Sequence, residues 1–161
     1  KILLGLNTFL GLEHRLEYVD TINNNIFYND SKATNPHSTI NAVRKLNQYN
    51  NITLLLGGQD KDFDFSKMID NLPDNVKNIV CFGKCRKKIL HSIKNKTMAH
   101  IQPDLKSAVI YANSITHDGV ILLSPACASF DEFSGFEQRG TYFKQIVASL
   151  KNNESVKGVV C

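Results

Sequence analysis

The sequence contains no apolar run that approaches the ~20 residues needed to cross a bilayer. Its apolar opening, residues 1–5, is also too short for a signal peptide. Its 4 cysteines are scattered, and a chain of 161 residues does not need disulfide staples to fold. We therefore expect a soluble, cytoplasmic protein with reduced thiols and no membrane partner.

The chain also lacks the motifs of several enzyme classes. It has no G-x-x-x-x-G-K-[ST] phosphate loop and no G-x-G-x-x-G dinucleotide fingerprint. No G-x-S-x-G elbow surrounds Ser129, which argues against a serine hydrolase. The spacing from Cys81 to Cys85 and the positions of the histidines match no metal-ligand pattern. We predict no metal site and no complete nucleotide-phosphate site within this chain alone.

The excess of positive charge is modest, with a formal net charge of +4. The densest basic cluster, at residues 84–88, lies where a helix is expected to begin. Such a cluster is more typical of a solvated helix face than of a nucleic-acid interface. We expect no nucleic-acid partner.

The composition is that of one globular domain, with 42% hydrophobic and 21% charged residues. After an opening hairpin at residues 16–28, β-compatible segments alternate with amphipathic helical segments. This order predicts an α/β fold with a Rossmann-like, mostly parallel sheet, an opening β-hairpin and helices on both faces. The later strands are expected at 52–56, 76–82, 97–101 and 119–123. The helices are expected at 36–46, 65–72, 104–114 and 137–150, with a further basic helix after Gly83 that ends at His91.

We divide the chain into three parts. Residues 1–10 are apolar without a clear partner, and we interpret them as the end of a preceding domain or a linker. Residues 11–150 form the predicted domain. Residues 151–161 are expected to be a loose C-terminal tail.

The most informative stretch is the polar loop at residues 29–35, which follows the hairpin and precedes a helix. Asn35 can cap that helix and Pro36 suits its first turn, so unpaired backbone N–H groups face the loop. Asp30 and Lys32 add a carboxylate and an ammonium group. This combination predicts a site for a ligand with phosphate and hydroxyl groups, and an ordinary solvated turn is the alternative.

Polar loops also follow the expected strands at 52–56 and 119–123. Ligands of parallel sheets bind beyond the carboxyl ends of the strands. We therefore predict that Thr34, Lys61 and Ser129, one from each loop, line one cleft at that edge.

Four blocks carry a family resemblance: FLGLEHR at 9–15, NDSKATN at 29–35, LLLGG at 54–58 followed by Lys61, and LSPACASFD at 123–131 continuing into FEQRG at 136–140. With these blocks the chain resembles the C-terminal domain of the Mur ligase family, in the branch that adds D-glutamate during peptidoglycan precursor synthesis. The second and fourth blocks are the most specific, because sister Mur ligases and folylpolyglutamate synthetases carry other residues in these loops.

The resemblance implies roles for seven residues. The positions that contact ATP in the family are occupied by Arg15, Asp30 and Lys32, and Lys32 is also the implied catalytic group. The positions that receive D-glutamate are occupied by Thr34, Lys61, Ser129 and Phe136. A lysine suits a carboxylate, whereas plain packing beneath the loop is an equal alternative for the phenylalanine.

One residue departs from the family pattern. Asp62 follows Lys61 where the family often has glycine or another small residue. An added carboxylate at this place is expected to weaken the attraction between Lys61 and an anionic substrate.

The resemblance implies an ATP-dependent, amide-forming ligase. An acyl phosphate forms on UDP-N-acetylmuramoyl-L-alanine, and the amine of D-glutamate attacks it. The family places its phosphate loop, Mg²⁺ ligands and UDP site in N-terminal and central domains that are missing here. We therefore expect this chain to act as a lid that supplies the amino-acid pocket, and to be inactive alone.

Two alternatives stay open at this stage. The chain can be a free-standing nucleotide- or amino-acid-binding module. It can also belong to a related Mur or folylpolyglutamate-type ligase that adds a different amino acid.

Overall fold

The structure is a computed structural model that describes residues 12–94 and 98–157. The predicted preceding segment at residues 1–10 lies outside the described residues. The elements along the chain are β1 (Glu17–Ile22), β2 (Asn25–Asn29), α2 (Pro36–Lys45), β3 (Ile52–Gly57), α3 (Phe65–Asp70), β4 (Val76–Phe82), α4 (Arg86–Ser92), β5 (Met98–Ile101), α5 (Leu105–Ile115), β6 (Val120–Ala126) and α6 (Phe136–Lys157).

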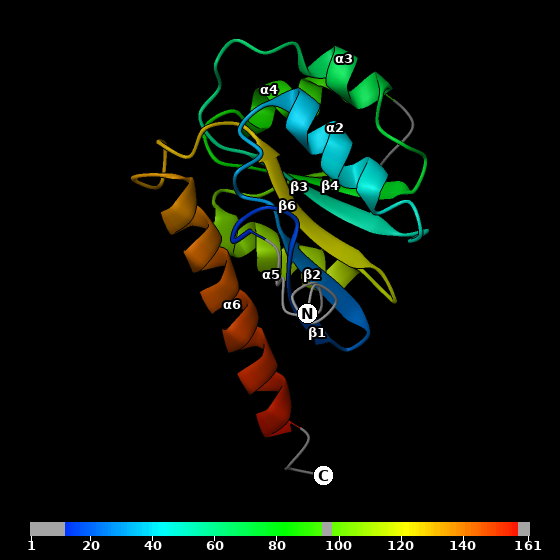
Figure 1. Cartoon of the computed structure of the whole chain (residues 1–161), viewed down its shortest axis with the longest axis vertical. Helices are drawn as coiled ribbons and strands as arrows, with labels where there is room; N and C mark the ends of the chain where they lie inside the picture. The colour runs from blue at the N-terminus through cyan, green and yellow to red at the C-terminus, as the bar shows by residue number, and fades with distance from the viewer. Residues whose placement is uncertain (1–11, 95–97, 158–161) are drawn as a thin grey trace, which may run out of the picture.

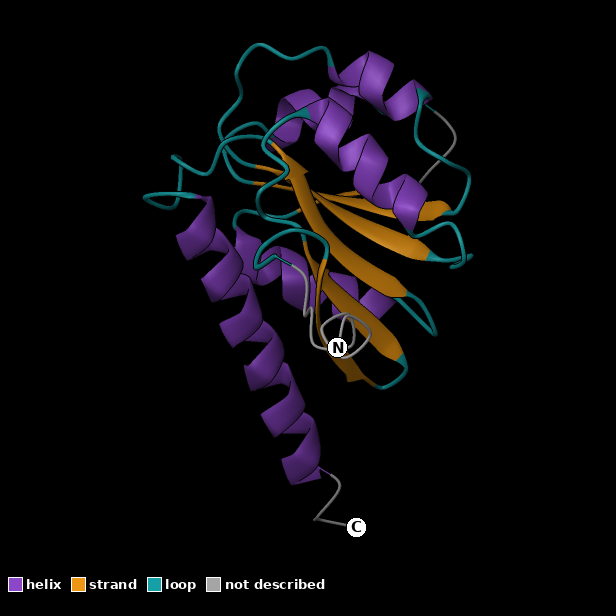
Figure 2. Ribbon diagram, in the orientation of Figure 1, coloured by secondary structure: helices purple, strands orange, loops and turns teal. Residues whose placement is uncertain are grey.

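The described strands form one sheet in the order β1-β2-β6-β3-β4-β5. β1 and β2 pair antiparallel as the opening hairpin, and every later pairing is parallel. Figure 1 shows α2, α3 and α4 on one face of this sheet and α5 and α6 on the other, and Figure 2 shows the same layers by element type. The predicted α/β fold is confirmed.

The central strand β3 shows why the sheet has two covered faces. All six of its residues are buried. Successive side chains of a strand point to opposite faces, so Leu54 and Leu56 join the core beneath α2, α3 and α4. Leu55 joins the core beneath α5 and α6. A continuous apolar run is thus what a doubly covered parallel strand requires.

Strand β6 continues past its predicted end at Leu123, to Ala126. A proline inside a central strand is tolerated where the ladder is interrupted. Pro125 falls in such a place, because the register between β3 and β6 shifts between Leu55 and Gly57. The expected polar turn therefore begins only after Ala126.

The expectation of a loose tail from residue 151 is wrong for its first part, because α6 continues to Lys157. Lys151 forms an ion pair with Asp20 of β1 at 2.8 Å, which attaches this part of the helix to the hairpin. The other predicted elements agree with the structure within two residues at each end.

Candidate functional site

The carboxyl edge of the sheet brings the three polar loops together. β6 lies between β2 and β3, and the three strands run parallel. Ala126 N donates a hydrogen bond to Ala33 O at 2.9 Å, and Gln59 N donates to Ala128 O at 2.8 Å. The loops that follow these strands are therefore neighbours, as the sequence predicts.

The opening loop, residues 29–35, leads into α2 through the predicted cap. The Asn35 side chain accepts from Ser38 N at 2.9 Å, and Pro36 occupies the first turn. At the other end of the loop, Asn29 Oδ1 accepts from Ser31 N at 3.1 Å. Both ends are fixed, so the N-terminus of α2 points into a defined loop.

Asp30 lies buried at the start of this loop, with 8% of its surface exposed. Its Oδ1 accepts from Leu16 N at 3.1 Å and its Oδ2 accepts from Ser124 Oγ at 2.7 Å. Burial raises the pKa of Asp30 to about 6, while these hydrogen bonds and the charges of Lys45 and Arg15 act in the opposite direction. Above that pH the carboxylate is ionised and retains lone pairs for a ligand hydroxyl.

A cavity of about 340 Å³ opens beside Asp30. Its lining consists of Arg15, Leu16, Asp30, Lys32, Ala33, Ser38, Asn41, Ala42 and Lys45. All three residues predicted to contact ATP thus meet in one cavity. Three cationic side chains around one carboxylate suit a ligand that carries phosphates together with hydroxyl groups.

Lys32 and Phe136, predicted to serve different ligands, are neighbours. Lys32 Nζ lies 5.0 Å from the centroid of the Phe136 ring, in a cation–π arrangement. Ser31 Oγ donates to Phe136 O at 2.8 Å. The ring therefore supports the lysine, and whether Phe136 also contacts D-glutamate or only packs here stays a prediction.

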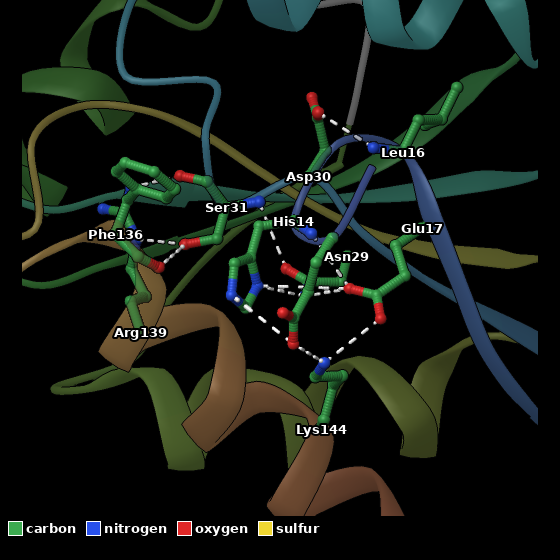
Figure 3. A network of polar contacts seen from close by, with 10 residues as sticks. His14, Leu16, Glu17, Asn29, Asp30, Ser31, Phe136, Arg139 and Lys144 are labelled. Atoms are coloured by element: carbon green, nitrogen blue, oxygen red, sulfur yellow. Dashed lines mark hydrogen bonds and ion pairs between the residues drawn. The ribbon is translucent and has the colours of Figure 1, made fainter. Parts of the chain in front are cut away.

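His14 is a member of the site that residue-by-residue reasoning missed, although it lies in the first family block. It is buried, and its carbonyl oxygen accepts from Lys32 N at 3.1 Å. Asn29 Nδ2 lies 2.9 Å from His14 Nδ1 and donates to Glu17 Oε2 at 2.9 Å. Figure 3 shows these side chains beneath the opening loop. Their contacts join β1, the opening loop and the residue before Arg15.

Helix α6 closes this network from below. Lys144 Nζ donates to Glu13 Oε1 at 2.6 Å and to Glu17 Oε1 at 3.1 Å (Figure 3). A Cβ atom built on Gly140 would lie 2.2 Å from His14 Nδ1. The imidazole ring thus occupies the space that a side chain at this helix position would fill.

Arg139 is a second residue that the sequence reasoning did not single out. It is fully buried on α6. Its Nε donates to Ser31 Oγ at 3.0 Å, its Nη2 donates to Ser31 O at 2.8 Å, and its Nη1 donates to Cys127 O at 3.1 Å. Burial lowers its pKa to about 10, so the guanidinium stays charged at neutral pH. One planar cation therefore fastens the opening loop to the loop after β6.

The residues predicted to receive D-glutamate are less closely grouped. Ser129 is 2% exposed, Thr34 is half-buried and Lys61 is exposed. None of them lines the cavity beside Asp30. A second hollow, of about 530 Å³, is lined by Gln59, Gly83, Lys84, Arg86, Pro103, Phe130, Asp131 and Glu132. The single cleft predicted for Thr34, Lys61 and Ser129 stays a prediction.

Asp62, the departure from the family pattern, has a φ angle of 60°. Glycine adopts this left-handed conformation without strain, and aspartate is one of the few other residues that tolerate it. The backbone therefore explains why small residues suit the position. Among the described residues, no ion pair joins Asp62 to Lys61.

In residues 12–94 and 98–157, no group of three or more His, Cys, Asp or Glu side chains could hold a metal ion. Over the same residues, none of the helices combines the length and the apolarity that crossing a membrane requires.

The mostly parallel sheet with helices on both faces places this chain in the α/β class, whose ligands bind beyond the carboxyl ends of the strands, where the polar cavity lies. The chain belongs to the Mur ligase family: the model of the Mur ligase glutamate ligase domain matches residues 14–127.

Relatives of known name extend this match over nearly the whole chain. UDP-N-acetylmuramoylalanine–D-glutamate ligase of Francisella philomiragia is 42% identical over 152 residues, which are 94% of this chain and 37% of the relative. The enzyme of the same name from Clostridioides difficile is 42% identical over 149 residues, which are 91% of this chain and 33% of the relative. The chain spans about a third of the length of these relatives.

Solved structures agree on the fold. UDP-N-acetylmuramate-alanine ligase from Thermotoga maritima matches with a TM-score of 0.64 and 18% identity, over 93% of this chain and 33% of that one. A bifunctional folylpolyglutamate synthase/dihydrofolate synthase from Yersinia pestis, complexed with AMPPNP and Mn ion, matches with a TM-score of 0.60 and 16% identity, over 87% of this chain and 32% of that one.

Proposed function

We propose that this chain is the C-terminal domain of an ATP-dependent ligase that adds D-glutamate to UDP-N-acetylmuramoyl-L-alanine. In this role it contacts ATP, supplies the pocket for the incoming amino acid and closes over the other two domains. The activity belongs to peptidoglycan precursor synthesis, in the cytoplasm, and through it to cell shape and division.

One observation carries the proposal: relatives named for D-glutamate addition are 42% identical to the chain over more than nine-tenths of its length. The cavity beside Asp30 supports it independently, because its cations and its buried carboxylate suit a nucleoside polyphosphate.

For ATP, we assign Asp30 to a ribose hydroxyl and Arg15 and Lys32 to phosphate oxygens. Ser124 and Leu16 hold the Asp30 carboxylate in place, so it meets the ligand in a fixed orientation. Lys32 is also assigned a catalytic role toward the transferring phosphoryl group, where a fixed ammonium stabilises developing negative charge.

For D-glutamate, we assign Lys61 to a carboxylate, Thr34 and Ser129 to polar contacts, and Phe136 to the wall between the two ligands. Lys61 is exposed at the same edge of the sheet as the other three residues. It can therefore meet a substrate that enters between domains.

The proposal places Mg²⁺ outside this chain. The described residues offer no cluster of ligands that fits the ion, and we derive no step through it. The phosphate loop and the Mg²⁺ ligands are assigned to the central domain of the longer protein. The isolated 161 residues are accordingly expected to fold but to release no ADP.

The test is to incubate the purified chain with ATP, Mg²⁺, D-glutamate and UDP-N-acetylmuramoyl-L-alanine, alone and with the separately produced remainder of the enzyme. We expect ADP and the glutamyl product only in the mixture. Turnover by the chain alone, at a rate near that of the intact enzyme, would overturn the lid role and favour a free-standing enzyme.

A related ligase of the folylpolyglutamate type is the second candidate, since those proteins share the fold. The Yersinia pestis protein is only 16% identical to this chain in sequence. A panel of D-glutamate, L-glutamate and other amino acids, with muramoyl and folate acceptors, separates the two. Use of L-glutamate on a folate acceptor would favour the second candidate.

A further inference from the structure

Two buried thiols lie in contact near the site, and the proposed function uses neither. Cys85 Sγ and Cys127 Sγ are 3.2 Å apart. Cys127 is fully buried and Cys85 is 5% exposed. Both are free thiols. The two residues are 42 positions apart in the chain, so only the fold brings them together.

The surroundings of the pair connect it to the loops of the site. Cys85 N donates to Gly58 O at 3.0 Å, and Arg139 Nη1 donates to Cys127 O at 3.1 Å. A Cβ atom built on Gly58 would lie 3.1 Å from Cys127 Cβ. The thiols therefore lie directly beneath Gly58, between the turn after β4 and the loop after β6.

We propose that Cys85 and Cys127 are a reversible oxidation site, whose disulfide fastens the turn after β4 to the loop after β6. A disulfide has an S–S length of about 2.05 Å, so the two sulfur atoms must approach by roughly 1 Å. Rotation of the side chains and a small loop movement supply this distance.

Cys85 is the thiol that reacts first. It has the only solvent-exposed surface of the pair. The hydrogen bond with Cys127 lowers the pKa of Cys85, which favours its thiolate, whereas the same contact and burial raise the pKa of Cys127. The thiolate is the nucleophilic form.

Hydrogen peroxide is the oxidant that we assign. The Cys85 thiolate attacks one peroxide oxygen, the O–O bond breaks, and the released hydroxide takes a proton and leaves as water, which forms a sulfenic acid on Cys85. Cys127 Sγ then gives up its proton and attacks Cys85 Sγ. The S–S bond forms, the S–O bond breaks, and the proton leaves with the hydroxide as a second water. Two thiols lose two electrons, and the peroxide gains them.

The consequence for ligand binding rests on the proposed function. Cys127 lies two residues before Ser129, and Gln59 pairs with Ala128 beside it. Movement of Cys127 toward Cys85 shifts Ser129 relative to the loop that carries Lys61. Small displacements of binding groups are costly, so we expect about a tenfold higher KM for D-glutamate in the oxidised enzyme, with little change for ATP.

The first experiment uses the chain itself. The protein is treated with hydrogen peroxide, digested without reductant and analysed by mass spectrometry. We expect a peptide pair joined through Cys85 and Cys127 that separates with dithiothreitol. Cys81 is a matched control, because it is also buried and its pKa is raised to about 12 by burial. Absence of the joined pair, or a pair through Cys81 instead, would overturn the proposal.

Variants sharpen this result. In a Cys161→Ser background, which removes the remaining cysteine, Cys85→Ser should abolish the joined peptide, and Cys81→Ser should leave it. Circular dichroism checks that each variant folds. Persistence of the same cross-link mass in Cys85→Ser would overturn the assignment, and the unmutated chain gives the answer if a variant fails to fold.

The second experiment uses the longer enzyme and compares KM for D-glutamate before and after peroxide, with Cys85→Ser as control. A rise in the unmutated enzyme that dithiothreitol reverses and the variant lacks supports the coupling. A mapped disulfide with an unchanged KM would overturn the coupling to the pocket. If the reduced enzyme does not use D-glutamate at all, the proposed function fails while the mapped disulfide stands on its own.

Discussion

The two loops that flank β6 at the carboxyl edge differ in how firmly they are held. The opening loop, residues 29–35, is bonded to the segment before β1, to β6 and to α6 through Asp30, Ser31 and Lys32. The loop at residues 58–64 is bonded at its start through Gly58 and Gln59 and to α4 through the ion pair of Asp60 with Lys88, while Lys61 and Asp62 at its tip are exposed.

This difference separates two ways of building a binding site. Of the residues assigned to ATP, the Asp30 carboxylate has a fixed position in a formed cavity, and the exposed side chains of Arg15 and Lys32 line the same cavity. The Lys61 side chain, in contrast, is exposed at the tip of its loop. Fixed groups lose less conformational freedom when a ligand binds. We infer that the nucleotide half of the site is organised in advance and that the amino-acid half is completed when its ligand and the other domains meet it.

The largest effect is expected from removing Arg139, which holds the opening loop to the loop after β6. Arg139→Met leaves the carbonyl groups of Ser31 and Cys127 without their donor inside the protein. We expect a loss of roughly 3 to 5 kcal/mol in the free energy of unfolding, measured by urea denaturation. Arg44→Met, the same exchange on the exposed face of α2, should change it by less than about 0.5 kcal/mol. Equal effects of the two exchanges would contradict the role of Arg139.

The pH dependence of stability tests how Asp30 is held in the opening loop. Its pKa is about 6 in the folded protein and about 3.9 in an unfolded chain. The folded state therefore binds more protons between these values, so this group's contribution to stability falls as pH rises from about 4 to 6 and is constant above.

As pH rises across that window, the free energy of unfolding of the unmutated chain should fall by on the order of 2 to 3 kcal/mol relative to that of Asp30→Asn. Urea denaturation of both proteins from pH 4 to 7 measures the difference. A difference that is independent of pH would mean that Asp30 does not titrate in this range.

The two lysines test the division between the halves directly. In the longer enzyme, Lys61→Ala should raise KM for D-glutamate more than KM for ATP, because a charge-assisted hydrogen bond to a carboxylate contributes about 1.5 to 3 kcal/mol. Lys32→Ala should show the reverse preference and also lower kcat.

Lys77→Ala supplies the control, since Lys77 is exposed near the amino end of β4, away from the site. Steady-state kinetics with each substrate varied in turn measures all three variants. If Lys61→Ala weakens both substrates equally, Lys61 does not distinguish the two halves.

The smallest expected effect concerns Phe136. Phe136→Leu keeps an apolar side chain but removes the ring beneath Lys32, which contributes about 0.5 to 1 kcal/mol through the cation–π contact. KM for ATP should rise a few-fold. Exposed Phe130, exchanged for leucine in the same way, is the control. A larger rise in KM for D-glutamate than for ATP would mean that Phe136 acts mainly on the amino acid and not through Lys32.

The sequence predicts those features that local pattern determines. The cap at Asn35, the buried strand β3 and the shared edge of the three loops all follow from residue types and their spacing. The shared cavity of Asp30 and Lys32 follows from their closeness in sequence, and Arg15 was named because it lies in a family block; their contact with ATP stays a prediction.

The rest depends on contacts between distant segments. Arg139 reads as an ordinary charged residue of an amphipathic helix until α6 is packed against Ser31, more than a hundred residues away. From the sequence, Pro125 predicts that β6 has already ended. The register shift that accommodates this proline arises only when β6 pairs with β3. The helical residues after 150 are stabilised in part by an ion pair with β1, which local propensity does not reveal.

Gly140 reverses the usual effect of alanine in a helix. Glycine inside a helix is normally about 1 kcal/mol less favourable than alanine, so Gly140→Ala would stabilise an isolated helix. In the folded protein the added methyl group would meet the His14 ring at 2.2 Å. The helix must then move away from β1 or the ring must leave its place, so the closeness of α6 to the opening loop is set by the absence of one carbon atom.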